Sequence, residues 1–123
     1  MQKALMLIKP FTVSRDEAGD VLSDTLEHST LLLTRFRQWV ICPNTLKALC
    51  SDNEVTLYPF VIKRPCWICL FTSYATDPFN ALYSLWGPEG SLRNKWRNGL
   101  HPSDTVVRLT DVSRVQLEED LLF

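Results

Sequence analysis

The sequence lacks an apolar run long enough to cross a membrane as a helix. Its longest apolar runs, residues 4–8 and 66–71, fall far short of the roughly 20 residues that a spanning helix needs. The first run is also too short for a secretory signal, and Lys9 ends it. We therefore expect a cytoplasmic protein that makes no membrane contact.

The sequence also lacks an excess of charge of either sign. Its 13 Lys and Arg residues and 14 Asp and Glu residues give a net charge of −1 at pH 7. Such a balance creates no overall attraction for nucleic acid or anionic lipid. One group of residues does mix basic and aromatic side chains, as RNA-binding surfaces do. RNA binding therefore remains a minor alternative function. The group consists of Arg93, Lys95, Trp96, Arg97 and Arg108.

Cysteine is scarce, and the 4 cysteines and 2 histidines do not form spaced pairs of metal ligands. Cys66 and Cys69 have the spacing of a redox motif, but they lie in a run with strand character. Side chains alternate between faces along a strand, so an offset of three residues places the two sulfurs on opposite faces. Redox motifs of this spacing belong at helix starts. The sequence therefore predicts neither a redox centre nor a bound metal.

Apolar patterns predict a single α+β domain over residues 1–123. Strand character covers residues 4–8, 31–41 and 66–71, and a short fourth strand is expected near His101. Helices are expected after a Ser14–Glu17 capping box, from Pro43, from Asp77-Pro78 and after Ser103. Two βαβ-type halves on one sheet indicate a ferredoxin-like sandwich, a four-stranded antiparallel sheet covered by helices.

The helix that starts at Asp77 and the segment behind it carry two further expectations. Phe79, Leu82, Tyr83 and Trp86 are spaced to share one buried helical face, and Gly87-Pro88 ends the helix. Residues 91–100 are polar and basic, which predicts a loop.

One histidine stands in a polar turn, Asn98-Gly-Leu-His101-Pro-Ser103-Asp104. A neutral imidazole beside such groups can act as a nucleophile or a base, and a surface histidine without a role is the alternative. The turn resembles the active-site signature Asn-x-x-His-Gly-Ser-Asp of the nucleoside diphosphate kinase family. Further motifs resemble that family in the same order: Leu7-Ile8-Lys9-Pro10, Val13-x-Arg15 and Gly19. The helix ending at Gly87-Pro88 and Ser91-Leu92-Arg93 resemble its divergent, cilium-associated branch.

The resemblance implies the family's fold and its two-step phosphoryl transfer. A histidine takes the γ-phosphate from a nucleoside triphosphate and passes it to a diphosphate, while cations surround the phosphates. At the matching positions, His101 would be the phosphoacceptor and Lys9 would lie near the transferred phosphate. Arg93 would hold phosphate oxygens, Asn98 would contact the sugar, and Ser103 would support the histidine. Without the resemblance, Lys9 would be interpreted as a solvated residue at the end of a strand, and Arg93 as a charged residue of a loop. Mg²⁺ with ATP or a nucleoside diphosphate is the expected ligand only if the chain is active.

Besides the neighbourhood of His101, three positions depart from the family's pattern. Cys50 stands where the family has a Tyr, Tyr83 where it has a phosphate-binding Arg, and Glu89 where it has a Thr. A carboxylate 4 Å from a phosphate repels it by roughly 1–4 kcal/mol. A lost hydrogen bond to a charged group costs about 1.5–3 kcal/mol. These changes predict a nucleotide affinity lower by orders of magnitude.

The neighbourhood of the histidine is also altered. Pro102 replaces the family's Gly after His101, and the family's Glu that orients the histidine lacks a clear counterpart, with Asp111 and Glu118 as candidates. Only 13 residues separate Gly87 from His101, where the family has a longer loop. That loop forms part of the family's cleft and oligomer contacts. A family-type hexamer is therefore not expected.

These observations favour a degenerate nucleoside diphosphate kinase-like domain that is kept as a structural or scaffolding subunit. Protein subunits of a larger complex are the expected partners, and the ciliary axoneme is the leading assembly. The alternatives are an active kinase working through phospho-His101 and a sensor that binds nucleotide without turnover. Aromatic and C-terminal residues are the candidate contacts, although most are also candidates for the core: Trp67, Trp86, Trp96, Leu121, Leu122 and Phe123.

Overall fold

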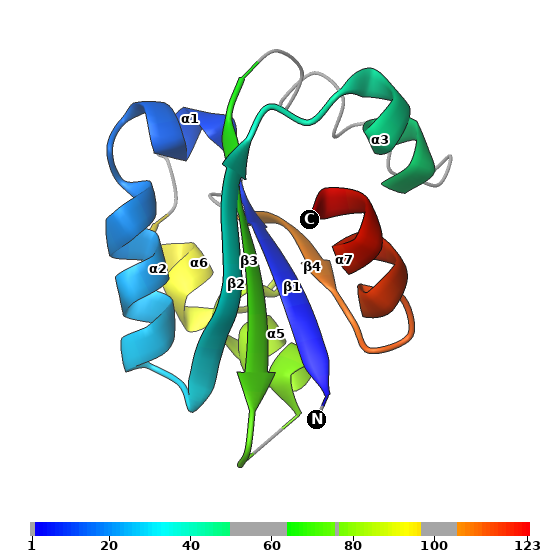
Figure 1. Cartoon of the computed structure of the whole chain (residues 1–123). Coiled ribbons are helices and arrows are strands. Elements are labelled where there is room, and N and C mark those ends of the chain that lie inside the picture. Colours follow the sequence, from blue (N-terminus) through cyan, green and yellow to red (C-terminus); the bar gives the residue numbers. More distant parts are fainter. Residues whose placement is uncertain (1, 50–63, 76, 97–105) are drawn as a thin grey trace.

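A computed structural model describes residues 2–49, 64–75, 77–96 and 106–123 of the chain. Within these ranges, no helix is both long and apolar enough to traverse a lipid bilayer. The described strands form one antiparallel sheet in the order β2-β3-β1-β4 (Figure 1). Their bounds are β1 (Lys3–Ile8), β2 (Leu31–Trp39), β3 (Cys66–Ser73) and β4 (Val106–Thr110).

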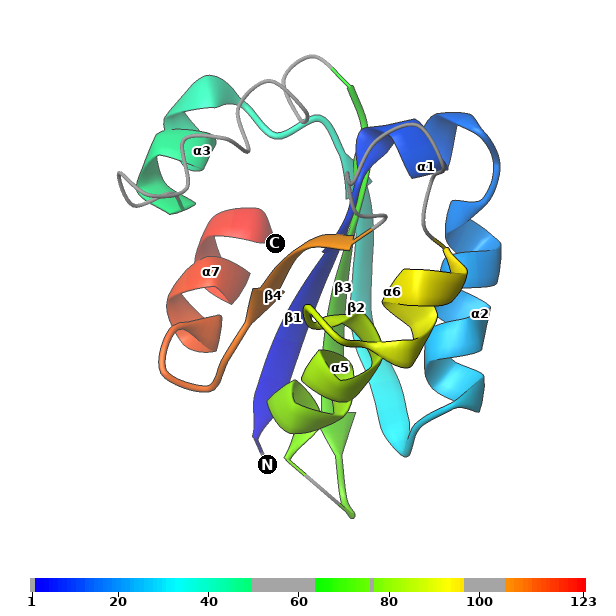
Figure 2. The same cartoon turned by 180° about the vertical axis from the view of Figure 1, so that it is seen from behind.

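Helices cover both faces of this sheet, which confirms the predicted ferredoxin-like sandwich. One face carries α2 (Ala18–Glu27), α5 (Pro78–Trp86) and α6 (Ser91–Lys95), and the other carries α3 (Pro43–Leu49) and α7 (Val115–Leu122) (Figure 2). A short helix, α1 (Pro10–Ser14), follows directly on the end of β1.

The sheet separates two hydrophobic cores, and β1 contributes to both. Met6 and Ile8 point into the core under α2 and α5, while Leu5 and Leu7 point into the core under α3 and α7. All four side chains are at most 2% exposed. The nearly continuous apolar run at residues 4–8 therefore reflects a central strand that is covered on both faces.

The two cysteines of β3 lie on opposite faces, as predicted. Cys66 belongs to the core under α3 and α7, and Cys69 to the core under α2 and α5. Burial raises the pKa of each thiol to about 12. Since the thiolate is the reactive form, these buried residues are structural and do not form a redox pair.

The predicted capping box at Ser14 is wrong. Proline at the first helical position starts α1 at Pro10, so Ser14 is the last residue of a helix. Ser14 Oγ donates to the carbonyl of Phe11 at 2.8 Å, and α2 begins after Glu17 without a side-chain cap. Asp16, with φ of 59°, turns the chain between the two helices.

Helix α5 starts and ends as predicted, but one residue of its expected buried face is exposed. Asp77 caps it by accepting from the backbone N–H of Phe79 at 2.9 Å, and Gly87 follows its last turn. Leu82 and Trp86 are buried, whereas Tyr83 is 51% exposed. The buried face is therefore rotated from the predicted one, with Leu85 buried in place of Tyr83.

The expectations for the C-terminal third also need correction. Residues 91–95 form α6 and not a loop, because Leu92 is buried in the core and fixes a segment that is otherwise polar. Ser103 lies outside the described residues, and the segment after it is the strand β4, not a helix. The last helix, α7, begins only after Arg114.

Candidate functional site

Lys9 lies at the junction of β1 and α1 with its side chain buried. Its carbonyl accepts from the N–H groups of Thr12 (3.1 Å) and Val13 (3.2 Å), so its backbone opens α1. The residue is only 7% exposed, and Nζ lies 5.8 Å from the ring centroid of Phe11. Lysine is almost never this buried without interactions that hold its charge. The interpretation of Lys9 as a solvated strand end is therefore wrong, because its side chain is buried.

Arg93 lies half-buried on α6, and α6 is fixed tightly against the end of α5. Leu92 anchors the helix by packing into the same core as Ile8. Gly90, directly before α6, allows the close approach: a Cβ added to it would lie 2.2 Å from the carbonyl oxygen of Leu85. Arg93 is thus carried by an ordered helix and not by a loop.

Asp24 of α2 holds the C-terminal end of α6 through hydrogen bonds. Its Oδ2 accepts from Lys95 Nζ at 2.7 Å and from the indole N–H of Trp96 at 3.0 Å. The hydrogen bond from Lys95 is the main cause that lowers the pKa of the Asp24 carboxyl. Two members of the basic and aromatic group are therefore engaged within the protein, which weakens the RNA-binding alternative.

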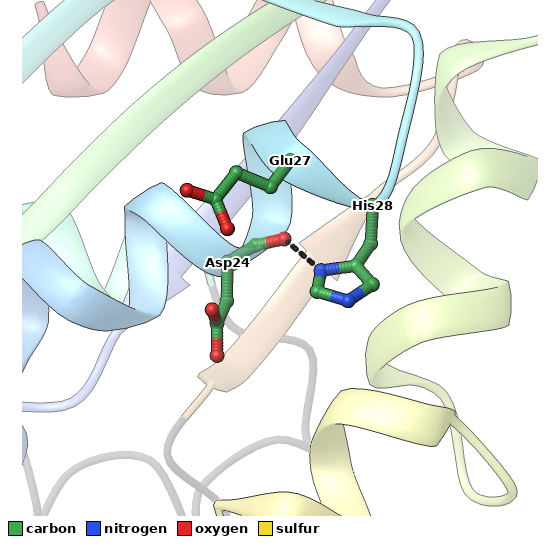
Figure 3. Close-up of side chains that lie close together, drawn as sticks. All are labelled: Asp24, Glu27 and His28. Atoms are coloured by element: carbon green, nitrogen blue, oxygen red, sulfur yellow. Dashed lines mark hydrogen bonds between the residues drawn. The ribbon is translucent and has the colours of Figure 1, made fainter.

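Asp24 also belongs to a group of residues with metal-ligand chemistry at the end of α2. Three residues each offer one potential ligand atom, and these atoms lie within 4.8 Å of one another: Asp24, Glu27 and His28. Figure 3 shows that His28 Nδ1 bonds the backbone carbonyl of Asp24, at 2.8 Å, while the Asp24 carboxylate points away from the imidazole. The Lys95 ammonium already neutralises that carboxylate and would repel a second cation. We assign no metal to this group.

An open hollow of about 380 Å³ lies between the end of α2 and α5. The described residues that line it include His28, Thr30, Asn80 and Ser84, and neither Lys9 nor Arg93 is among them. The hollow is therefore separate from Lys9 and Arg93, the two predicted site residues that the structure describes.

Solved structures of nucleoside diphosphate kinases match the arrangement of strands and helices. The enzyme of Borrelia burgdorferi with bound vanadate and ADP superposes with a TM-score of 0.78 at 15% identity, over 99% of this chain and 86% of that chain. The chain has the nucleoside diphosphate kinase fold. The enzyme of Pyrobaculum aerophilum gives 0.76 at 13% identity, over 99% and 95% of the two chains. The enzyme of Halobacterium salinarum with CDP gives 0.71 at 18%, over 99% and 87%.

Sequence comparison gives no further assignment. The sequence matches no family model, and no curated protein matches it. At such low identities, the nucleoside diphosphate kinase fold is what the structural likeness shows, and activity has to be argued from side chains.

Two positions that depart from the family's pattern are among the described residues, and both lie on the surface. Tyr83 is half exposed on α5, and its ring packs against that of Phe79 with centroids 5.9 Å apart. Glu89 is exposed in the turn between α5 and α6. At the two positions where the resemblance implies a cation and a hydroxyl, the chain exposes a phenol and a carboxylate. Cys50 lies outside the described residues.

The two carboxylates considered for orienting His101 have other partners. Asp111 accepts from the hydroxyl of Ser113 at 2.6 Å, and this bond is the main cause that lowers its pKa. Glu118 is fully buried, accepts from Thr110 Oγ1 at 2.8 Å and lies 3.4 Å from Arg114 Nε. Asp111 thus stabilises the turn that precedes α7, and Glu118 stabilises the packing of α7 on β4.

Of the predicted site residues, Lys9 and Arg93 are in the part of the chain that the structure describes. Asn98, His101 and Ser103 lie outside the described residues, so their assigned roles stay predictions. Sequence reasoning missed Asp24, because nothing within α2 distinguishes it from the exposed Asp20. Its partners Lys95 and Trp96 lie 71 and 72 residues away in the sequence.

Proposed function

We propose that the chain is a degenerate nucleoside diphosphate kinase-like domain that serves as a structural subunit of a larger protein assembly, with little or no kinase turnover. The observation that carries this proposal is Tyr83. It takes the position that the resemblance gives to a phosphate-binding Arg, and its half-exposed ring packs on Phe79. The fold and both cores are kept, while this phosphate contact is gone.

Glu89 supports the same conclusion through electrostatics. An exposed carboxylate takes the position of a Thr that the resemblance places beside the phosphates. Repulsion of roughly 1–4 kcal/mol then adds to the lost hydrogen bonds of about 1.5–3 kcal/mol. Each 1.4 kcal/mol lowers affinity tenfold, so nucleotide binding falls by orders of magnitude.

The competing proposal is an active kinase that works through phospho-His101, and the burial of Lys9 favours it. In that case Lys9 would lie near the transferred phosphate, Arg93 would hold phosphate oxygens, Asn98 would contact the sugar, and Ser103 would support the histidine. Mg²⁺ would enter on the nucleotide's phosphates, since these five site residues do not include a carboxylate. In our proposal the same residues are remnants of that site.

The partners in our proposal are protein subunits, and the ciliary axoneme is the assembly. The axonemal part is supported by the resemblance of the helix ending at Gly87-Pro88 and of Ser91-Leu92-Arg93 to the cilium-associated branch. A domain that keeps its core but loses its cleft contributes through its surface.

The test is calorimetric titration of the chain with ADP and Mg²⁺. We expect no saturable binding at micromolar nucleotide, because a cation is missing and a carboxylate is added near the phosphates. Lys9→Ala is the control, since it removes the more buried of the two described cations of the predicted site. Micromolar binding that Lys9→Ala abolishes would show a working nucleotide site and contradict the proposal.

A further inference from the structure

The open hollow between the end of α2 and α5, here called the α2–α5 hollow, lies between two helices that are fixed to each other. A buried hydrogen bond joins these helices, since the indole N–H of Trp86 donates to Thr25 Oγ1 at 3.0 Å. The hollow has a volume of about 380 Å³, so it can admit a whole side chain of a partner. The described residues that line it are His28, Ser29, Thr30, Asn80, Ala81 and Ser84.

The polar side chains that α2 and its end contribute have already donated their protons within the chain. His28 Nδ1 lies 2.8 Å from the carbonyl oxygen of Asp24 (Figure 3). A carbonyl only accepts, so Nδ1 carries the proton and Nε2 of the neutral ring keeps its lone pair. Ser29 Oγ donates to the carbonyl of Thr25 at 2.6 Å. These two side chains therefore offer acceptors to a ligand.

The side chains that α5 contributes are engaged in the same way. The amide nitrogen of Asn80 lies 3.5 Å from the carboxylate of Asp77, and Ser84 Oγ donates to the carbonyl of Ala81 at 2.9 Å. The carbonyl oxygen of Asn80 and the lone pairs of Ser84 are left for a ligand. A group that carries donors and no acceptor complements such a lining, and the arginine guanidinium has five N–H donors and no acceptor.

The surroundings of the hollow are also negative. The C-terminal end of a helix carries roughly −0.5 of a charge and exposes backbone carbonyls. The last turn of α2 holds no basic residue but ends with Glu27, whose carboxylate has an oxygen within 4.8 Å of a ring nitrogen of His28. On the α5 side, the Asp77 carboxylate lies beside Asn80. Among the residues that the structure describes, neither Glu27 nor Asp77 forms an ion pair with Lys or Arg.

The sequence shows why few cations reach this place. Residues 16–34 contain five Asp and Glu residues and residues 65–92 contain two, while neither segment contains Lys or Arg. Lys95 of α6 pairs with Asp24 at 2.7 Å and cancels that charge alone. The charge of Glu27 is thus left to attract a basic ligand, and charge agrees with the hydrogen-bonding groups of the lining.

We propose that the α2–α5 hollow binds an arginine side chain of a partner protein. The guanidinium would donate to His28 Nε2 and to the carbonyl oxygen of Asn80, and its methylene stem would lie on Ala81. Lysine fits less well, because a planar guanidinium can donate toward both helices at once while an ammonium is a compact charge. This inference rests on the proposed subunit role and gives the chemistry of one partner contact.

The test is an NMR titration of the isotope-labelled chain with a blocked pentapeptide that carries arginine between glycines. Two further peptides carry lysine or citrulline at the centre, and citrulline keeps the shape of arginine without its charge. We expect saturable shifts at His28, Asn80 and Ser84, with a Kd for the arginine peptide at least about tenfold lower than for the citrulline peptide. The lysine peptide should fall between them.

Two kinds of variant separate the hydrogen bonds from the charge. Asn80→Leu removes an acceptor at an exposed position and should weaken arginine binding severalfold with an unchanged circular dichroism spectrum. Glu27→Lys should weaken it by about fivefold or more. Asp20→Lys is the matched control, because it makes the same change on exposed α2 about 10 Å away, where salt screens it, and should leave the Kd within about twofold.

Equal affinity for the arginine and citrulline peptides would overturn the inference. Arginine binding that Asn80→Leu and Glu27→Lys both leave unchanged would also overturn it, as would the absence of shifts at millimolar peptide. None of these results touches the proposed loss of kinase turnover, which phosphate transfer measures separately. Phosphate transfer by a chain that binds the arginine peptide would contradict the proposed function alone.

Discussion

Replacing Gly90 with Ala should destabilise the chain by about 3 kcal/mol or more, the largest effect we expect from a single methyl group. The added Cβ would lie 2.2 Å from the carbonyl oxygen of Leu85 and 2.6 Å from the amide nitrogen of Trp86. Both are backbone atoms of α5, so no side chain can rotate away to make room. Helix α6 would have to separate from α5, and Arg93 would move with it.

Gly19→Ala is the matched control. The Cβ added there meets its nearest neighbour, Trp67, at an ordinary contact distance of 3.9 Å. Because Gly19 lies inside α2, alanine should stabilise the chain by roughly 0.5–1 kcal/mol. Urea unfolding followed by circular dichroism measures both variants. Equal stabilities would show that α6 is not packed against α5 as described.

Replacing Tyr83 with Arg and Glu89 with Thr together should raise the affinity for ADP with Mg²⁺ by about 10- to 100-fold or more. The first change adds a cation at the position that the resemblance gives to a phosphate ligand, and the second removes a repelling carboxylate. Even the lower ends of the two energies, about 1.5 and 1 kcal/mol, sum to more than one factor of ten. Both positions are exposed, so the fold should tolerate the changes.

The control for this pair is Ser84→Arg with Glu27→Thr. Ser84 is the exposed neighbour of Tyr83 on α5, and Glu27 is exposed on α2, so the change in net charge is the same. Titration calorimetry on both double variants separates a local effect from a general one. Equal gains in the two variants would mean that Tyr83 and Glu89 do not face the nucleotide's phosphates.

The features that can be predicted from the sequence are those that depend on residues close together in the chain. The apolar run of β1 requires cover on both faces, and the sheet provides it. Asp77 and Gly87 bound α5 because capping depends on the neighbouring backbone alone. The offset between Cys66 and Cys69 fixed their opposite faces through strand geometry.

Features that depend on distant partners were not predictable. Helix α6 forms in a polar segment because Leu92 reaches the core and Gly90 fits against α5. Asp24 anchors that helix through Lys95 and Trp96, and its own helix gives no sign of this. At the candidate site, the roles of Lys9 and Arg93 rest on the resemblance and stay predictions, and the burial of Lys9 was not predictable from the sequence.

The most direct test of the degenerate site is phosphorylation of His101. The folded chain and His101→Ala would be incubated with Mg²⁺ and γ-labelled ATP, and acid-labile label would be measured. We predict no label above that of the His101→Ala variant, since the phosphates have lost a cation and gained a carboxylate nearby. Label present in the natural chain and absent from the variant would show a working first half-reaction and contradict the account.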